Sequence, residues 1–268
     1  MTVQQGFAPH IATLGDGPRQ ALALHCTMAF GGAWAGISKA LPELTLIAPD
    51  MPSHGRSPDW DGQSDFAETT FAASLAALPD DGPVDVIGHS FGAVIGLMLA
   101  IAHPERLRSL TVIEPVFFAV AQNDAPETLA QHAVSAKPFN DAIQSGAFEK
   151  AARAFNRMWS SDAPAWDSLP ERTRAAMTRG VQVVPDTQSL LFDDTAGLLA
   201  PGALDACSVP TLVLRGEDAH AAIIATHDGL LARLPNATGA VIKGAGHMAP
   251  ISHPAEVATE IGALLGRS

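Results

Sequence analysis

The stretch 88–92 (GHSFG) places a serine in a Gly-x-Ser-x-Gly pattern, which suits a nucleophilic hydroxyl. It follows an apolar run at 83–87 that indicates a buried strand, and it precedes an apolar run at 93–102 long enough for a helix. A strand-to-helix turn this tight needs residues without bulk on both sides of the serine, and Gly88 and Gly92 meet that need. The serine then projects above the sheet edge, beside the N–H groups of the first helical turn. The pattern predicts that Ser90 is a nucleophile, with an ordinary glycine-rich turn as the alternative.

A serine hydroxyl becomes a good nucleophile only when a base takes its proton, and His247 is the best candidate among ten histidines. His247 lies in the glycine-rich stretch 244–248 (GAGHM), after the last predicted strand and before the final helix. A histidine at the carboxyl end of a strand can reach over Ser90, although it could also be a surface loop residue. We therefore predict that His247 is the base, and we expect His89 to point away from Ser90.

The negative oxygen that forms during attack on a carbonyl must be met by two N–H donors already in place. The backbone N–H of Phe91, directly after the serine, is expected to be one of them. The other is expected from Thr27, in the loop 25–28 (HCTM) after an early strand, although this loop could be an ordinary strand-end turn.

Strand-like apolar runs alternate with helical stretches, which is typical of a doubly wound, mostly parallel sheet. Strands are predicted at 11–14, 21–25, 44–48, 83–87, 110–113, 211–214 and 239–242, and helices at 34–41, 66–78, 93–102 and 254–265. From 116 to 202 only a helical pattern cut by prolines is present. We therefore predict a core formed by 1–115 and 203–268, with a helical cap at 116–202.

The cap is expected to cover the carboxyl edge of the sheet, where open α/β sheets bind ligands. Phe117 and Trp159 are its predicted substrate-binding residues, expected to line a pocket above Ser90. The alternative is that the aromatic side chains of this segment form only its core.

The composition of the chain restricts which partners it can bind and in which compartment we expect it. The chain has 268 residues, 47% of them hydrophobic, which suits one large domain or a domain with an insertion. A formal charge of −12 argues against a nucleic-acid partner. Two cysteines without metal-ligand spacing predict no disulfide framework and no metal site. Without a signal-like start or a membrane-spanning run, the sequence predicts a cytoplasmic protein with no membrane partner.

Over almost its whole length the chain resembles the α/β-hydrolase-fold serine hydrolases. Four landmarks carry the resemblance in the family's order: the loop at His25, the segment 50–57 (DMPSHGRS), the turn around Ser90, and Gly246 with His247. The family usually has glycine where this chain has Cys26. The resemblance implies an α/β-hydrolase fold, a mostly parallel central sheet flanked by helices, with a cap and no cofactor.

The acid that completes a catalytic triad is open between two residues. In most of the family it lies three residues after a glycine that ends the strand before the last. That position is Ala219 in this chain, with Asp218 one residue short. A branch that resembles the haloalkane dehalogenases has its acid 24 residues after the nucleophile, and here that position is Glu114. We expect Glu114 to be the acid, with Asp218 as the alternative.

The function that the resemblance implies is hydrolysis of a small acyl compound, most simply a carboxylic ester, through an acyl-serine intermediate. The same triad could instead cleave carbon–carbon bonds, open lactones or act as a cofactor-free perhydrolase. A non-catalytic ligand-binding protein on this scaffold is the alternative from another class. The motifs do not predict an oligomeric state.

Overall fold

The computed structural model describes residues 2–159 and 165–268, so positions 160–164 of the predicted cap lie outside the described residues. Within that part of the chain, seven strands form one sheet in the order β1-β3-β2-β4-β5-β6-β7. Strand β1 runs antiparallel to β3, and every other neighbouring pair is parallel. The strands are β1 (Ile11–Leu14), β2 (Arg19–Leu24), β3 (Leu44–Pro49), β4 (Val84–His89), β5 (Leu107–Ile113), β6 (Thr211–Gly216) and β7 (Ala237–Ile242). The predicted mostly parallel sheet is confirmed.

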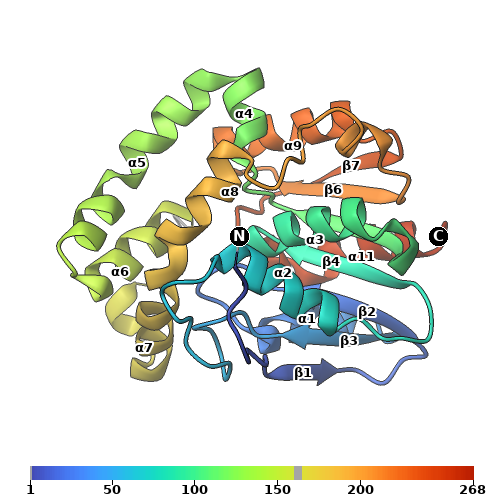
Figure 1. The fold of residues 1–268 in the computed structure, drawn as a ribbon, viewed down its shortest axis with the longest axis horizontal. Coiled ribbons are helices and arrows are strands. Elements are labelled where there is room, and N and C mark those ends of the chain that lie inside the picture. The colour runs from blue at the N-terminus through green and yellow to red at the C-terminus, as the bar shows by residue number, and fades with distance from the viewer. Residues whose placement is uncertain (1, 160–164) are drawn as a thin grey trace.

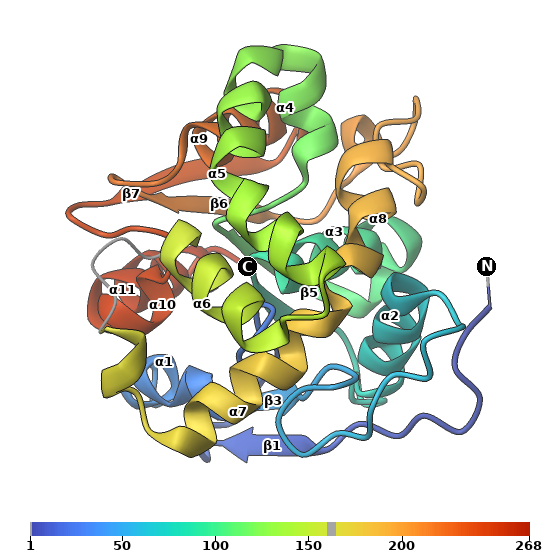
Figure 2. The same ribbon diagram turned by 90° about the vertical axis from the view of Figure 1, so that its left-hand side faces the viewer.

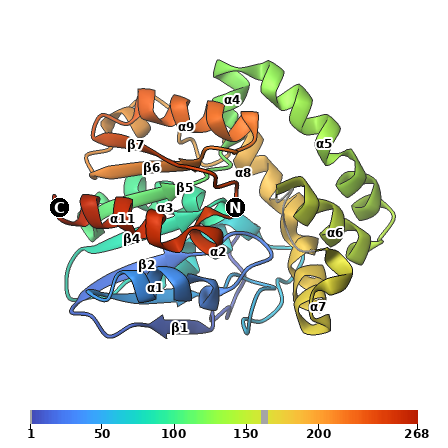
Figure 3. The same cartoon turned by 180° about the vertical axis from the view of Figure 1, so that it is seen from behind.

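Helices cover both faces of the sheet, so its central strands are buried on both sides. On one face lie α2 (Phe66–Ala76), α3 (Phe91–Ala102) and α9 (Ala221–Arg233), seen in front of the sheet in Figure 1. The other face carries α1 (Ala35–Ala40), the short α10 (Ala249–Ser252) and α11 (Pro254–Leu265), seen from behind in Figure 3. Every residue of β4 is buried between these layers. The strand that leads to Ser90 is therefore held by the core from both sides.

Between β5 and β6, most of the described residues are helical. The α-helices are α4 (Phe118–Asp124), α5 (Pro126–Gln144), α6 (Phe148–Trp159), α7 (Glu171–Gly180) and α8 (Gln188–Asp193). Helices α5 to α8 lie across one end of the sheet in Figure 2, whereas α4 packs against α9. The segment at 126–193 is thus a helical insertion. It has a small core of its own, which includes Phe139, Trp166 and Val181.

Hydrogen bonds and an ion pair made by Arg179 link this insertion to the loop after β3. The Arg179 guanidinium of α7 donates hydrogen bonds to the Ser57 carbonyl at 2.6 Å and to the Gly55 carbonyl at 3.2 Å. It also pairs with the Asp59 carboxylate at 2.7 Å. Because three acceptors from the loop after β3 hold one side chain, α7 is anchored to that loop.

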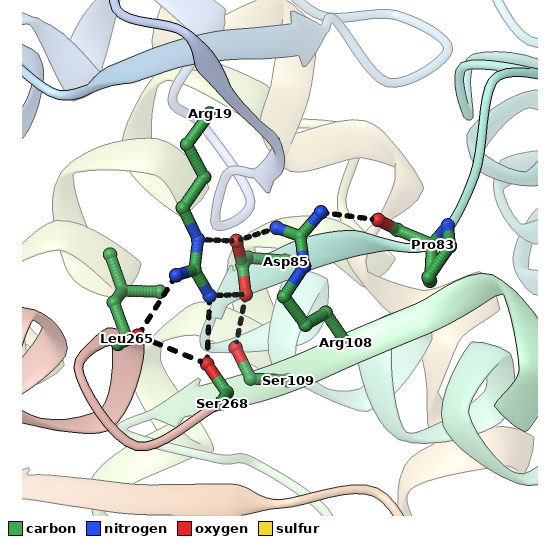
Figure 4. A network of polar contacts seen from close by, with 7 residues as sticks. All are labelled: Arg19, Pro83, Asp85, Arg108, Ser109, Leu265 and Ser268. Atoms are coloured by element: carbon green, nitrogen blue, oxygen red, sulfur yellow. Dashed lines mark hydrogen bonds and ion pairs between the residues drawn. The ribbon is translucent and has the colours of Figure 1, made fainter.

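A second polar network closes the opposite end of the sheet (Figure 4). The fully buried Asp85 carboxylate, near the start of β4, accepts hydrogen bonds from Arg19 at 2.6 and 2.9 Å and from Arg108 at 2.8 Å. The Ser109 hydroxyl donates to the same carboxylate at 2.6 Å. The hydrogen bond to Asp85 raises the pKa of Arg19. This network joins β2, β4 and β5, and Arg19 extends it to Leu265 and Ser268 at the end of the chain.

Across residues 2–159 and 165–268, no helix has both the length and the apolar character needed to cross a membrane.

Candidate active site

The turn between β4 and α3 has the tight geometry that the glycine pattern predicts. Ser90 has φ 56° and ψ −116°, a backbone conformation that L-residues rarely adopt. A Cβ on Gly88 would lie 2.5 Å from the Gly92 carbonyl oxygen, and one on Gly92 would lie 2.6 Å from the His25 carbonyl oxygen. The Ser90 N–H donates to the Ile113 carbonyl of the neighbouring strand at 2.9 Å. The two glycines and this hydrogen bond hold the serine above the sheet edge.

Two hydrogen bonds join Ser90 to a buried carboxylate through His247. The Ser90 hydroxyl lies 3.0 Å from His247 Nε2, and His247 Nδ1 lies 3.0 Å from Glu114 Oε2. The other carboxylate oxygen, Oε1, accepts the Gly216 N–H at 2.6 Å. Ser90 is 4% exposed, His247 6% and Glu114 0%. This is the arrangement in which a carboxylate orients an imidazole and the imidazole takes a proton from a hydroxyl.

The topology of the sheet explains why Glu114 reaches the histidine. Strand β5 lies directly beside β4, so the residue after β5 stands next to Ser90 at the same edge. Glu114 has φ 50°, and its N–H donates to the Leu214 carbonyl of β6 at 2.7 Å. Asp218, the alternative acid, is exposed in the turn after β6. The structure brings Glu114, and not Asp218, to His247.

His89 contributes a contact that the sequence reasoning missed. Its side chain bonds the His247 main chain, with Nε2 2.8 Å from that carbonyl oxygen. Burial lowers the pKa of His89 to about 3, so its ring is neutral and Nε2–H is the donor. The position of His89 at the end of β4 gave no signal of this partner, because the partner lies 158 residues away in the sequence. The contact fixes the backbone of the loop that carries His247.

The two predicted oxyanion donors lie on the wall of one cavity with Ser90. Phe91 is the first residue of α3, so its N–H has no acceptor within the helix. Thr27 belongs to a loop whose next residue, Met28, has φ 64°. The Met28 N–H donates to His54 Nε2 at 2.9 Å, and burial lowers the pKa of His54 to about 3, which keeps this nitrogen able to accept. His54, from the segment 50–57, thereby shapes the loop that presents Thr27.

Cys26 precedes Thr27 in this loop and is buried. Burial raises the pKa of its thiol to about 12, so the group is not a thiolate at neutral pH. The described residues hold no cluster of three or more His, Cys, Asp or Glu side chains suited to a metal ion.

Two apolar cavities meet at the centre formed by Ser90 and His247. The first, of about 220 Å³, lies under α5, α6 and α8 and includes Ser90, Thr27 and Phe91 in its wall. The second, of about 210 Å³, includes His247 and the exposed side chains of Phe30 and Ile251. A set of three residues lines both: Thr27, Phe155 and Trp159.

Trp159 lies in the wall of both cavities. Its ring centroid is 4.7 Å from that of His247, with 34° between the planes. Phe117 differs from its prediction: it is fully buried in the main core and is absent from the described walls of both cavities. Its neighbour Phe118 lines the first cavity instead and stacks on Trp159 at 6.2 Å. Successive residues at the start of a helix point in different directions, so the Phe117–Phe118 pair supplies one core residue and one wall residue.

Known proteins resemble this chain in sequence and in fold. Residues 21–260 match the sequence model described as the alpha/beta hydrolase family. The chain is 31% identical over 267 residues to lipase LipV of Mycobacterium tuberculosis, covering 96% of this chain and 97% of that protein. It is 27% identical over 233 residues to the pimeloyl-[acyl-carrier protein] methyl ester esterase of Aromatoleum aromaticum, covering 85% and 90%. An alpha/beta hydrolase from Sphaerobacter thermophilus superposes with a TM-score of 0.70 at 21% identity, covering 100% of this chain and 99% of that one.

Proposed function

The chain belongs to the alpha/beta hydrolase family, and on that premise we propose that it hydrolyses carboxylic esters of largely apolar acids through an acyl-Ser90 intermediate. The observation that carries the proposal is the pair of 3.0 Å hydrogen bonds from Ser90 through His247 to Glu114 at the base of an apolar cavity. The names of the lipase and esterase relatives support the same class of reaction. Glu114 is the acid of this proposal, and Asp218 has no part in it.

In the acylation step the Ser90 oxygen attacks the ester carbonyl carbon while its proton passes to His247 Nε2. The carbonyl oxygen becomes negative and accepts hydrogen bonds from the Phe91 and Thr27 N–H groups. The carbon–oxygen bond to the alcohol then breaks, and the alcohol leaves with the proton from His247. Glu114 stabilises the imidazolium while it lasts.

In the second step water replaces the alcohol. His247 takes a proton from the water, whose oxygen attacks the acyl carbon, and the same two N–H groups stabilise the negative oxygen. The bond to Ser90 breaks, and His247 returns the proton to the serine oxygen. The acid leaves, and Ser90 and neutral His247 are restored.

The two cavities suggest how the ester lies. The leaving alcohol must be close to His247, which gives it a proton, and His247 lines the second cavity with the exposed Phe30 and Ile251. The acyl chain then occupies the first cavity, whose wall includes Ser90 and Phe91. Substrate would enter and alcohol would leave through the more exposed second cavity.

The test is hydrolysis of p-nitrophenyl esters with acyl chains of two to ten carbons, combined with labelling by a fluorophosphonate probe. The wild-type protein should hydrolyse the esters and become labelled once per chain. Ser90→Ala should lose labelling and about 10⁶-fold in kcat, the loss for a triad serine. Ser135→Ala, a matched control on an exposed position of α5, should retain both. Wild-type protein that neither hydrolyses any ester nor takes the probe would overturn the proposal.

A further inference from the structure

His132 is a buried polar side chain for which the proposed reaction has no use. It lies on α5 in the wall of the first cavity and is 8% exposed. Aromatic rings surround its imidazole: Phe118 at 4.9 Å, Trp159 at 5.5 Å and Phe192 at 6.2 Å between centroids. His220 meets it edge to face at 5.5 Å. A polar ring placed among apolar walls costs free energy unless something bonds to it.

The surroundings of His132 determine its charge. Burial, followed by the nearby His220, lowers the pKa of His132 to about 4. At neutral pH the ring is therefore uncharged, with one nitrogen that donates and one that accepts.

The positions of the two nitrogens determine which one donates. Nδ1 is sealed from solvent and has no hydrogen-bond partner among the described residues. A sealed N–H without an acceptor is rarer than a sealed acceptor without a donor, so we assign the proton to Nε2. Nε2 is not among the buried atoms without a partner, and the His132 ring borders the first cavity. We therefore place Nε2 at the cavity surface. His132 thus offers an unused N–H donor to whatever fills the first cavity.

Of the other polar residues in the cavity wall, Ser90 and Thr27 belong to the catalytic centre, and Trp159 Nε1 is sealed from solvent with no hydrogen-bond partner among the described residues. The Thr187 hydroxyl already donates to the Val184 carbonyl at 2.8 Å, and Asn140 and Gln188 are exposed at the outside. Lys, Arg, Asp and Glu are absent from the described wall of this cavity. A carboxylate in the acyl chain would therefore be buried without a cation, which is strongly unfavourable.

We propose that His132 selects acyl chains that carry an uncharged oxygen acceptor, a ketone or a hydroxyl, in place of plain alkyl chains. The inference rests on the proposed function, because it takes the first cavity as the acyl site. An alkyl chain would cover the Nε2–H without bonding it, whereas a chain oxygen at the right carbon would accept it. A site built in this way discriminates against the analogue that lacks the oxygen.

The experiment compares p-nitrophenyl octanoate with its 5-oxo, 6-oxo and 7-oxo derivatives, with active protein counted by fluorophosphonate titration. In the wild-type protein kcat/KM relative to octanoate should peak at one oxo position. His132→Phe keeps the ring shape and removes both nitrogens, and it should lower that peak ratio about tenfold. Leu129→Ala changes an apolar residue of the same helix and wall, so it should affect all four esters together and keep the ratio.

Other outcomes overturn the inference. If the wild-type protein gave the same kcat/KM for octanoate and all three oxo esters, the inference would be wrong. This result needs no variant, so it holds even if His132→Phe fails to fold. An unchanged peak ratio in folded His132→Phe would also overturn the inference, as would wild-type preference for an ω-carboxylate ester that depends on His132. None of these results touches the ester hydrolase proposal, which is tested by octanoate turnover and its loss in Ser90→Ala.

Discussion

Replacement of Glu114 by glutamine tests the assignment of the acid with little change in shape. The carboxylate has two partners: Oε2 lies 3.0 Å from His247 Nδ1, and Oε1 accepts the Gly216 N–H at 2.6 Å. In Glu114→Gln the amide oxygen can keep the Gly216 hydrogen bond, which leaves the NH₂ group facing Nδ1. An NH₂ group donates, so Nδ1 must accept and the imidazole proton moves to Nε2. The nitrogen that faces the Ser90 hydroxyl can then no longer take its proton.

The expected fall in kcat follows from two losses: the tautomer that lets His247 accept the serine proton, and the negative charge that stabilises the imidazolium. A triad acid changed to its amide lowers kcat about 10⁴-fold, which corresponds to about 5 kcal/mol in the activation free energy. Because the side chain keeps its size and one hydrogen bond, we expect thermal unfolding of Glu114→Gln to remain cooperative. The loss should appear in kcat and in the rate of probe labelling, with little change in KM.

The assay is kcat for p-nitrophenyl butyrate at pH 8, with Asp218→Asn as the matched control. Asp218 is the alternative acid, and its exposed side chain should tolerate the same chemical change with less than a threefold effect on kcat. A folded Glu114→Gln protein within tenfold of wild-type kcat would refute the assignment. So would an Asp218→Asn protein that loses more activity than Glu114→Gln.

Three further predictions concern the cavity, the core and the buried histidines. Trp159→Ala joins the two cavities and should shift the preferred acyl length, whereas Phe117→Ala should lower the unfolding free energy by about 3–5 kcal/mol and leave the preference unchanged. Asp85→Ala leaves two arginines without their buried partner and should cost about 3–5 kcal/mol in a denaturant titration, with kcat of the folded fraction unchanged. The pKa values of His54 and His89, about 3 in the fold, lie below the unfolded value, so only the unfolded chain gains these protons between pH 7 and 5. The unfolding free energy should therefore fall by about 2 kcal/mol per histidine at pH 5, and His89→Gln should remove one such contribution.

Each of these has a result that would contradict it. The same acyl preference in Trp159→Ala and wild type would return Trp159 to a packing role. Full stability in Asp85→Ala would mean that the network of Figure 4 contributes little. Equal pH dependence of unfolding in His89→Gln and wild type would mean that His89 is not held neutral by the fold.

The local pattern alone determined the elements around Ser90, because a tight turn and a buried strand are short-range requirements. Two glycines at fixed spacing, an apolar strand before them and an apolar helix after them leave few other conformations. The sequence also predicted how strands and helices alternate along the chain, because alternating apolar runs indicate which segments must be buried. The division at 116–202 into a cap stays a prediction, although the described residues of 126–193 are mainly helical.

Only the tertiary structure decided which distant residues meet. Glu114 and Asp218 both follow strands of the same sheet, and the order β4-β5-β6 places the first beside Ser90 and leaves the second in an exposed turn. Phe117 and Phe118 are alike in sequence, and the direction in which the helix starts sends one into the core and the other to the cavity. His132 had no sequence signal, because a histidine on a helix becomes a buried donor only when rings from other elements close around it. Strand order, helix direction and burial are properties of the packed chain, and no short pattern contains them.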